Sequence, residues 1–569
     1  MKSIFTKRIT HLFTMAAAFC GLCSCVNIDQ TLGGDLIATN QLFDTFVAEY
    51  DLSEISMKKV DSLSGYSQKR VAIGAIRDAN GLTTRSCAFS LVPFYDSLDF
   101  GKNPQFKDFS LNLLRDTISL NNENQRNILQ NVNVYELEES TTNIFDVNGR
   151  IKHGKKRITK GIPVYDGTYD TLAFSFTKEF GEKYMNLTLE ESSDIEKYLQ
   201  KLPGIYIETD EPLGDGGRID MFKTQLQYNS SYYYIQGNYA ELSFSAEYDG
   251  QRKDTSFYYL FGLENFTNID SLVSNGANTF PQYCLNMSTE EGTQTGGKAG
   301  AKMKIEGGGG LKPVISSREL QSIMREEIGR HGNPDVAVIN KATIVMPYEF
   351  PDDYTYMRHY PQILSPTCRI KGVSSKDSTA TMYSYAALTD ASSNDENQGN
   401  INRSLCQYSP DITYHAQSIL RLDSETANFA NYDIWFLILA QETVGKNDSG
   451  SGSSNAMSDY YTQMMYAQYY NNMMYGGYGG YGYGGYGGYG GYGYGGYGGY
   501  GGYGYGNNYY SYYLMNQMYS SMYASSSSSE ESEKSLDIFR YYDATLYGPE
   551  CPDETKRPKL KFTYSIPRE

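Results

Sequence analysis

The chain has 569 residues, too many for a single hydrophobic core, which predicts at least two domains. Its formal net charge of −17 at pH 7 argues against attraction to nucleic acid phosphates, so we expect no nucleic acid partner. The chain contains 54 tyrosines and 1 tryptophan, and such side chains serve either in cores or as contact surfaces. Sugars and other proteins therefore stay open as partners.

The first 24 residues have the layout of a secretory signal peptide. A basic start is followed by an apolar stretch at 9–22, which is shorter than the ~20 residues that a membrane-spanning helix needs. The stretch ends in Leu22-Cys23-Ser24-Cys25, which resembles the lipobox of bacterial lipoproteins. This resemblance implies that residues 1–24 are removed, that Cys25 becomes the lipid-bearing N-terminus, and that the lipid anchors the protein to a membrane.

Beyond a short tether, expected at 25–45, the dominant pattern is an alternation of apolar and polar residues. From Ala240 to Tyr248 this alternation is typical of a strand with one face in a core and one in water. Shorter apolar stretches predict further strands at 87–92, 109–113, 132–137 and 257–261. A helix is expected at 193–201, before a Pro-Gly pair. Together these elements predict a first antiparallel β-sandwich domain at 46–278.

The C-terminal half shows the same β pattern and predicts a second antiparallel β-sandwich at 279–569. Residues 559–566 alternate in the same way. Stretches that are apolar throughout predict central strands covered on both faces, at 342–346 and 434–439. A helix is expected where Ser316 and Glu319 form a capping box ahead of a row of apolar residues. We therefore predict a mainly β fold of two tandem sandwiches with a few short helices.

A segment at 445–534 interrupts the second domain. It is rich in Ser and Gly, then in Tyr and Met, and then in repeats such as Gly476-Gly477-Tyr478. It lacks the branched aliphatic residues that a core requires, and glycine at this density has a large ordering entropy. We therefore predict a long disordered Gly/Tyr-rich loop, which connects the strand at 435–439 to a strand at 538–546.

No catalytic, cofactor or metal site is predicted, and the chain is not expected to be an enzyme. Residues 292–298 fit Gly-x-x-x-x-Gly-Lys, yet Ala299 stands where a phosphate-binding loop needs Ser or Thr to hold magnesium. A Gly-rich turn that enters a strand at 302–305 is the preferred interpretation. The Gly-x-Ser-x-Gly motif of many hydrolases does not occur in the sequence.

Residues that could ligate a metal are scattered along the chain. The mature histidines are expected on the surface or in turns, at His153, His331, His359 and His415. The cysteines after Cys25 are odd in number and lack metal-binding spacing, so we expect packing residues at Cys87, Cys284, Cys368, Cys406 and Cys551. Acidic turns near Asp210, Asp220 and Asp352 lack the spacing of a calcium loop and are expected to be solvated.

Several segments follow one another in an order typical of a known family: residues 31–37, 72–78, 87–89, 296–305, 339–347 and 557–564. They resemble the lipoproteins of domain-of-unknown-function family 4270 from Bacteroidota, although the Gly/Tyr insertion departs from the usual pattern. The segments at 339–347 and 557–564 also resemble jelly-roll modules related to carbohydrate-binding domains. The resemblance implies an outer-membrane lipoprotein with jelly-roll-like sandwiches, and leaves its periplasmic or cell-surface orientation open.

Two classes of function agree with these features. The preferred one is a non-catalytic structural or accessory lipoprotein that binds other envelope proteins, such as an outer-membrane β-barrel. The alternative is a glycan-binding lipoprotein whose jelly-roll faces stack sugars on tyrosines. Exposed aromatic residues grouped on one sheet face would favour glycans, whereas aromatic residues buried in cores would favour the accessory role. Trp435 lies in an apolar stretch, and we therefore prefer the accessory role.

Overall fold

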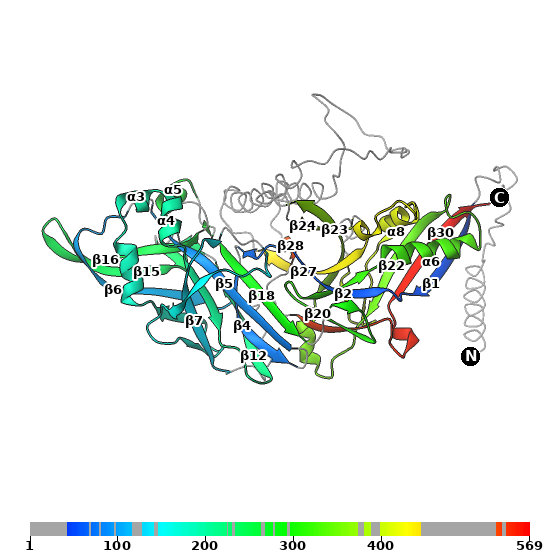
Figure 1. The fold of residues 1–569 in the computed structure, drawn as a ribbon, viewed down its shortest axis with the longest axis horizontal. Coiled ribbons are helices and arrows are strands. Elements are labelled where there is room, and N and C mark those ends of the chain that lie inside the picture. The colour runs from blue at the N-terminus through cyan, green and yellow to red at the C-terminus, as the bar shows by residue number, and fades with distance from the viewer. Residues whose placement is uncertain are drawn as a thin grey trace, which may run out of the picture.

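The computed structural model is mainly β, with antiparallel sheets and few helices, as the sequence predicts (Figure 1). It describes residues 43–568 apart from 68–69, 79–80, 96–97, 117–127, 142–145, 225, 230–233, 263–267, 277–278, 281, 293–295, 374–380, 389–398, 445–530 and 537–541. The predicted signal peptide, the lipidation residue Cys25 and nearly all of the predicted Gly/Tyr-rich loop lie outside the described residues.

One body of the molecule, here called the N-terminal sandwich, contains four short helices. They are α2 (Lys178–Met185), α3 (Leu189–Ser193), α4 (Ile195–Lys201) and α5 (Ile269–Ser274). Its strands are β3 (Tyr66–Ser67), β4 (Arg70–Asp78), β5 (Gly81–Pro93), β6 (Lys102–Leu114), β7 (Gln130–Leu137), β8 (His153–Arg157), β9 (Val164–Tyr165), β10 (Thr171–Ser175), β11 (Ile205–Thr209), β12 (Gly216–Lys223), β13 (Leu226–Asn229), β14 (Tyr234–Gly237), β15 (Ala240–Tyr248), β16 (Gln251–Gly262), β17 (Thr279–Phe280) and β18 (Cys284–Gly292). The long strand β5 organises this body, because it pairs with β4, β11, β16 and β18.

The other body, the C-terminal sandwich, contains α6 (Ser317–Gly329) and α8 (Thr413–Leu420), with short 3-10 turns η5 (Tyr354–His359), η7 (Phe429–Asn431) and η8 (Glu554–Lys556). Its strands are β1 (Phe43–Asp51), β2 (Ile55–Lys59), β19 (Gly297–Lys298), β20 (Lys302–Glu306), β21 (Leu311–Ile315), β22 (Val338–Pro347), β23 (Ile363–Val373), β24 (Thr381–Ala387), β25 (Ile401–Asn402), β26 (Gln407–Tyr408), β27 (Ile434–Val444), β28 (Glu531–Leu536), β29 (Asp543–Tyr547) and β30 (Lys559–Pro567). A 5-stranded sheet of order β1-β30-β22-β26-β25 and a 7-stranded sheet built around β21, β27 and β23 both contribute to its core.

Strand pairing corrects the predicted domain boundaries. β1 pairs with β30 from Phe43 opposite Pro567 to Asp51 opposite Lys559, and β2 pairs with β21. Both strands therefore belong to the C-terminal sandwich, although 46–278 was assigned to the first domain, and β1 begins inside the predicted tether. In the same way, β18 pairs with β3 and β5 and belongs to the N-terminal sandwich, beyond the predicted boundary at 278. Alternation identifies a strand, but the choice of its partner is a long-range contact that local pattern does not encode.

Most predicted elements are found where the sequence places them. β15 has the predicted bounds, and the predicted strand at 87–92 lies within β5. The helix expected at 193–201 is found as α4, which begins at Ile195 after the N-cap Asp194; the Asp194 carboxylate accepts hydrogen bonds from the first turn of α4. Ser316 caps α6 as predicted, but the Glu319 carboxylate accepts hydrogen bonds from Ser53 and Glu54 instead of completing the capping box.

The predicted loop at 445–534 is shorter at its C-terminal end than expected. β28 begins at Glu531 and pairs with β27, with Val444 directly opposite Glu531. The sequence instead predicted a partner strand at 538–546, but the strand found there, β29, pairs with β20. The residues at 531–534 are mostly polar, and strand pairing at a sheet edge does not require an apolar pattern.

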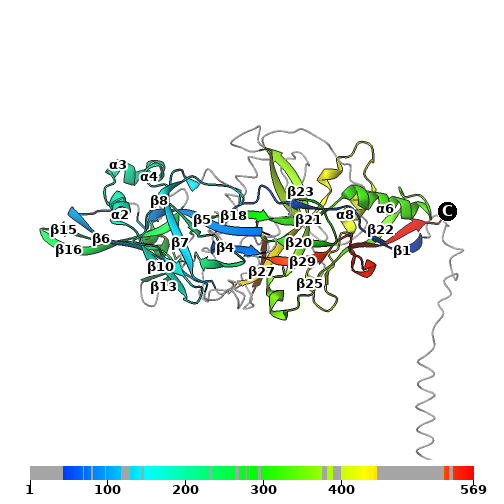
Figure 2. The same ribbon diagram turned by 60° about the horizontal axis from the view of Figure 1, so that its bottom comes forward.

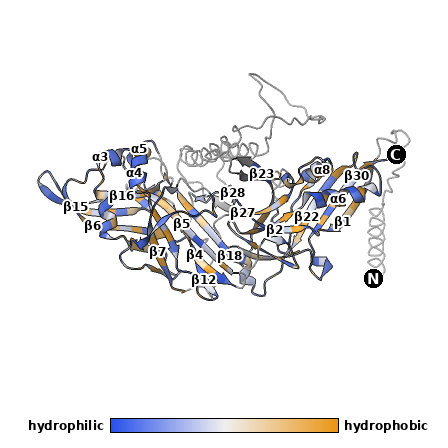
Figure 3. Ribbon diagram, in the orientation of Figure 1, coloured by the Kyte–Doolittle hydropathy of each residue, from blue (hydrophilic) through white to orange (hydrophobic). Residues whose placement is uncertain are grey.

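The two sandwiches lie end to end along the longest axis of the molecule (Figures 1 and 2). Each has its own hydrophobic core, one built from residues between Val71 and Cys284 and the other from residues 48–57 and 299–566. Hydrophilic residues predominate on the helices α3 and α6, which lie on the outside of the sheets (Figure 3). The chain passes between the sandwiches after β2 and again after β18, and both connections lie at the junction between the two bodies.

Candidate functional site

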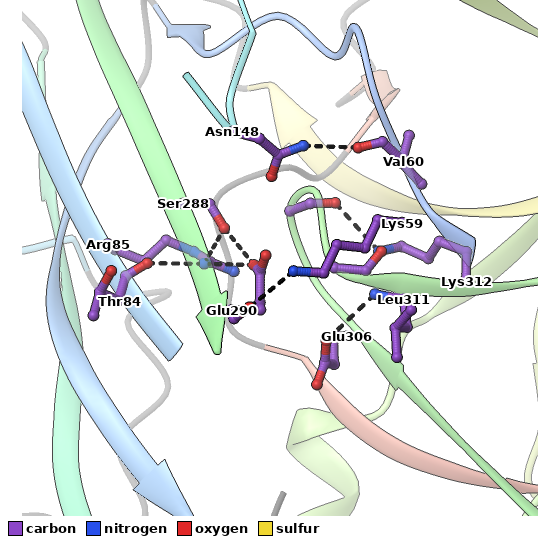
Figure 4. A network of polar contacts seen from close by, with 12 residues as sticks. Lys59, Val60, Thr84, Arg85, Asn148, Ser288, Glu290, Glu306, Leu311 and Lys312 are labelled. Atoms are coloured by element: carbon purple, nitrogen blue, oxygen red, sulfur yellow. Dashed lines mark hydrogen bonds and ion pairs between the residues drawn. The ribbon is translucent and has the colours of Figure 1, made fainter. Parts of the chain in front are cut away.

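A network of polar contacts lies at the junction between the sandwiches (Figure 4). It is built around Gly307-Gly308-Gly309-Gly310, the turn between β20 and β21. The Val60 amide donates to the carbonyl of Gly309 at 3.2 Å, and the Asn148 side-chain amide donates to the carbonyl of Val60 at 2.8 Å. A Cβ on Gly309 would lie 2.0 Å from Asn148 Oδ1, so this close approach requires glycine.

A buried ion pair lies on the N-terminal side of this turn. Arg85 on β5 donates through Nη1 to Glu290 Oε1 on β18 at 3.0 Å, and also to the hydroxyl of Ser288. The Ser288 hydroxyl in turn donates to the same Glu290 oxygen. All three side chains are buried, and adjacent strands β5 and β18 hold them on one sheet face. Such a pair is favourable only because each charge has hydrogen-bond partners in place.

Two lysines on the C-terminal side complete the polar contacts of the junction. Lys312 is fully buried, and its ammonium donates to the carbonyls of Gly308 and Gly310 at 3.2 and 3.0 Å. Burial lowers the pKa of Lys312 to about 8, against the opposing attraction of Glu290 and Glu306. Lys59 on β2 donates to the backbone carbonyl of Glu290 at 2.8 Å, which connects the strands of the two sandwiches directly.

An apolar and aromatic cluster covers the junction on its other side. Its buried members come from both sandwiches and from the connection between them: Val60, Leu63, Val147, Val314, Tyr385, Trp435 and Leu437. The Arg369 guanidinium lies 4.5 Å from the Trp435 ring centre, and Tyr385 donates to Asp61 of the connection at 2.9 Å. Trp435 is only 2% exposed, so its position at the junction excludes it as a surface platform for sugars.

Lys304 adds a further ionic contact across the junction. Its ammonium, on β20, lies 3.0 Å from Asp78 Oδ2 on β4 of the other sandwich. The geometry favours a fixed connection, because buried Lys304 meets Asp78 and Lys59 meets the Glu290 carbonyl across the junction. The Arg85–Glu290 pair and the Lys312 bonds stabilise the two sides of the junction, each within its own body. The cations and carboxylates of the junction are mutually engaged, which suits a mechanical role better than proton transfer to a substrate.

A second candidate, the contact between Cys368 and His415, does not have the geometry of a catalytic pair. The sulfur lies 3.9 Å from Nδ1 and 3.8 Å from Nε2, so it faces the ring and is not aligned with one nitrogen. His415 Nε2 lies 2.9 Å from the carbonyl of Tyr432, which can only accept, so this nitrogen carries the proton. Burial raises the pKa of Cys368 to about 12 and lowers that of His415, which keeps both groups neutral.

The predicted cysteine role is confirmed for the described residues. Cys87, Cys284, Cys368, Cys406 and Cys551 are all free thiols, and three of them are buried. Lys298, at the end of the Gly-x-x-x-x-Gly-Lys segment, lies in β19 and is followed by the strand β20, in line with the predicted turn and strand. A phosphate-binding loop would instead lead into a helix.

The predicted surface or turn position is wrong for His415, which lies on the helix α8, and the predicted solvated turn is wrong for Asp220, which lies on the strand β12; His359 lies in the turn η5, as the prediction allows. His359 and His415 are buried, and Asp220 is buried in an ion pair with Arg218, with 2.6 Å between Oδ2 and Nε. Sequence spacing did not reveal these positions, because each lies in a short polar segment whose burial depends on elements far away in the chain. Among the described residues, no group of three or more His, Cys, Asp or Glu side chains is arranged to hold a metal ion.

Most tyrosines in the described part of the chain are buried or half-buried. The most deeply buried are Tyr184, Tyr198, Tyr259, Tyr348, Tyr408, Tyr542 and Tyr564. Three are exposed, and they lie on separate elements: Tyr169 between β9 and β10, Tyr354 on η5 and Tyr414 on α8. This distribution is the one expected of the accessory class rather than of a tyrosine platform for sugars.

The junction itself was not predicted from the sequence. The run of four glycines at 307–310 was its one local signal, since such a run permits close backbone approach. Comparison with protein-family models, with curated proteins and with solved structures finds no match to this chain. In the part of the chain that the structure describes, no helix is long and apolar enough to cross a membrane.

Proposed function

We propose that the protein is a non-catalytic lipoprotein of the outer membrane, related to family 4270, which is anchored through Cys25 and binds other envelope proteins. The observation that carries this proposal is the buried junction. Two sandwiches that are connected by the Lys304–Asp78 ion pair, by the bond from Lys59 to the Glu290 carbonyl, by the contacts of the glycine turn and by a shared apolar cluster form a rigid body. A rigid body can present a large fixed surface to a partner.

The placement of aromatic residues supports the accessory role over glycan binding. Sugar recognition uses flat apolar rings that face solvent, and here Trp435 and most described tyrosines pack inside the molecule. For the purified protein without its lipid, we therefore expect no saturable binding on a glycan array or by calorimetry. Saturable binding to one class of polysaccharide would replace the accessory role with the glycan-binding alternative.

The lipid anchor has a direct test in the substitution Cys25→Ala. Two acyl chains provide stable anchoring, so loss of the modified cysteine should move the protein from the membrane fraction to the soluble fraction. Cys23→Ala is a matched control, because it removes a neighbouring thiol while keeping a small residue in the lipobox. Fractionation after a carbonate wash is the measurement, and a Cys25→Ala protein that stays in the membrane would contradict the anchor.

The partner can be identified by affinity purification of the native lipoprotein from detergent-solubilised envelope. The accessory role predicts an envelope protein in stoichiometric amount, bound equally well after treatment with glycosidases. A preparation that retains only polysaccharide would contradict it.

A further inference from the structure

One end of the solvent-facing side of the 5-stranded sheet carries several exposed apolar residues. Side chains alternate along β1, so Phe43, Thr45 and Val47 point away from the core, whereas Phe46 packs against it. Phe43 is 51% exposed and Val47 is 80% exposed. Two such residues on an edge strand form a surface that a monomeric soluble protein normally avoids.

Neighbouring strands extend this apolar face. Thr45 is opposite Ser565 on β30, which is opposite Val338 on β22, and Val47 is opposite Thr563. Val338 is exposed, as is Val336 just before β22. The set formed by Phe43, Val47, Val336 and Val338 is here called the apolar face. Between them lie Thr and Ser side chains, so the face has no charge along these positions of β1 and β30.

One cation lies within this face, because Lys341 on β22 is exposed and is opposite Thr563, the residue that is also opposite Val47. The charges of β1 and β30 on the same side of the sheet lie toward the other end of β1. There Glu49 binds Lys559 and Lys561 at 2.8 and 2.9 Å, and Lys559 also lies 3.8 Å from Asp51. These charges compensate one another. The apolar face is therefore confined to the end of the sheet at which β1 begins and β30 ends.

That end is also the one nearest to the lipid. β1 begins at Phe43, and residues 26–42 join it to Cys25. A chain of this length spans at most about 60 Å even when it is fully extended. The apolar face is therefore held close to the bilayer whenever Cys25 is acylated, whereas the N-terminal sandwich lies at the opposite end of the longest axis (Figures 1 and 2).

We propose that the apolar face rests on the bilayer surface and inserts Phe43, Val47 and Val338 among the lipid headgroups. This inference rests on the proposed anchor at Cys25. A lipid surface is the occupant because the short tether supplies it at high local concentration and because exposed apolar side chains dominate the face. The long side chain of Lys341 can keep its ammonium among the headgroups, so insertion of the apolar residues needs no anionic lipid. The contact directs the N-terminal sandwich away from the membrane, where it is accessible to partners.

The test uses tryptophan as a depth probe, because the one native tryptophan is buried at the junction and gives a constant background. Phe43→Trp and Val47→Trp are compared with Tyr169→Trp and Leu213→Trp, which alter exposed residues of the N-terminal sandwich. Each acylated full-length protein is reconstituted in neutral phosphatidylcholine vesicles with brominated acyl chains. Emission from positions 43 and 47 should shift to the blue and be strongly quenched, whereas emission from positions 169 and 213 should be unchanged.

Mass spectrometry of the N-terminal peptide reports acylation separately. Acylated protein in which positions 43 and 47 are no more quenched than positions 169 and 213 overturns the membrane contact and leaves the anchor intact. Protein that carries no lipid overturns the anchor and the contact together. Quenching that appears only with anionic lipid would show a charge-driven contact and would overturn the proposal. Cross-linking between two β1 strands in place of quenching would show that a second copy covers the apolar face, and would overturn it as well.

Discussion

At the scale of single residues, the junction depends on Glu290 as the carboxylate that bonds Arg85. The guanidinium of Arg85 is buried, its Nε has no hydrogen-bond partner, and its Nη1 relies on Glu290, Ser288 and the carbonyl of Thr84. Removal of one partner from a buried ion pair leaves the other charge without compensation, which is far more costly than loss of an exposed pair.

We therefore expect Glu290→Gln to lower the free energy of unfolding by about 3 kcal/mol. The amide preserves the shape of the side chain, so the loss reports the charge rather than a cavity. The neighbouring Glu291 on β18 is exposed, and Glu291→Gln is a matched control with an expected effect within about 0.5 kcal/mol. Urea unfolding of both variants is the measurement, and equal effects of the two substitutions would contradict the role given to Glu290.

Lys312 makes a prediction about pH. Burial lowers its pKa in the folded protein from an ordinary 10.5 to about 8, so between these values the unfolded chain binds more protons than the folded one. Stability due to this group therefore rises as the pH rises from 8 toward 10.5, and below pH 8 the full cost of burying the charge is present.

The variant Lys312→Met removes this titration while keeping a long apolar side chain. Groups that titrate in both proteins cancel in the difference between them. Wild type should therefore gain about 3 kcal/mol of stability relative to Lys312→Met between pH 7 and pH 10.5. Denaturant unfolding at several pH values measures this difference, and a difference that is constant with pH would show that Lys312 is neutral or solvated in the folded state.

At the scale of elements, β27 and β28 form an antiparallel pair whose ends are already adjacent. Val444 lies opposite Glu531, so residues 445–530 connect two neighbouring positions of one sheet. The pair extends to Leu439 opposite Leu536, next to the buried part of β27. A connection between paired ends can be shortened without moving either strand.

We expect that replacing residues 445–530 with Asn-Gly yields a folded protein that is at least as stable as the parent. Loop closure entropy depends weakly on length, so the gain in the free energy of unfolding is at most about 3 kcal/mol. Calorimetry should show an unchanged or higher Tm. A Tm several degrees below that of the parent would show that the removed tyrosines contribute to packing. In that case, a variant in which a Gly/Ser segment of the original length replaces residues 445–530 would have the same low Tm, because it also lacks the tyrosines.

At the scale of the whole molecule, the junction predicts that the two sandwiches unfold together. Trp435 lies in the cluster shared by both bodies, so its fluorescence reports on the junction, whereas circular dichroism reports on all strands. The contacts that cross between the bodies, namely the Lys304–Asp78 pair, the Lys59 bond to Glu290 and the shared cluster, should couple the cores into one cooperative transition. The two signals should therefore give coincident urea curves, and Trp435 fluorescence that changes well before the dichroism would indicate independent bodies.

The sequence by itself determined the strands. Side chains of a strand alternate between its two faces, so the alternation of apolar and polar residues shows which of them face a core. This pattern occurs at Ala240–Tyr248 and at 559–566, and a stretch that is apolar throughout forms the buried part of β27. It also determined the cap of α6 at Ser316, since capping is a contact within one turn. These features are local, and local physics is enough to predict them.

Only the tertiary structure decided which strands are neighbours and which polar residues are buried. The pairing of β1 with β30 joins residues that are far apart in sequence, and it moves β1 and β2 out of the predicted first domain. The carboxylate of Glu319 turned from its own helix toward Ser53, and Asp220 and His415 became buried under distant elements. Partner choice and burial depend on the sum of many long-range contacts, and no short segment of the sequence contains that sum.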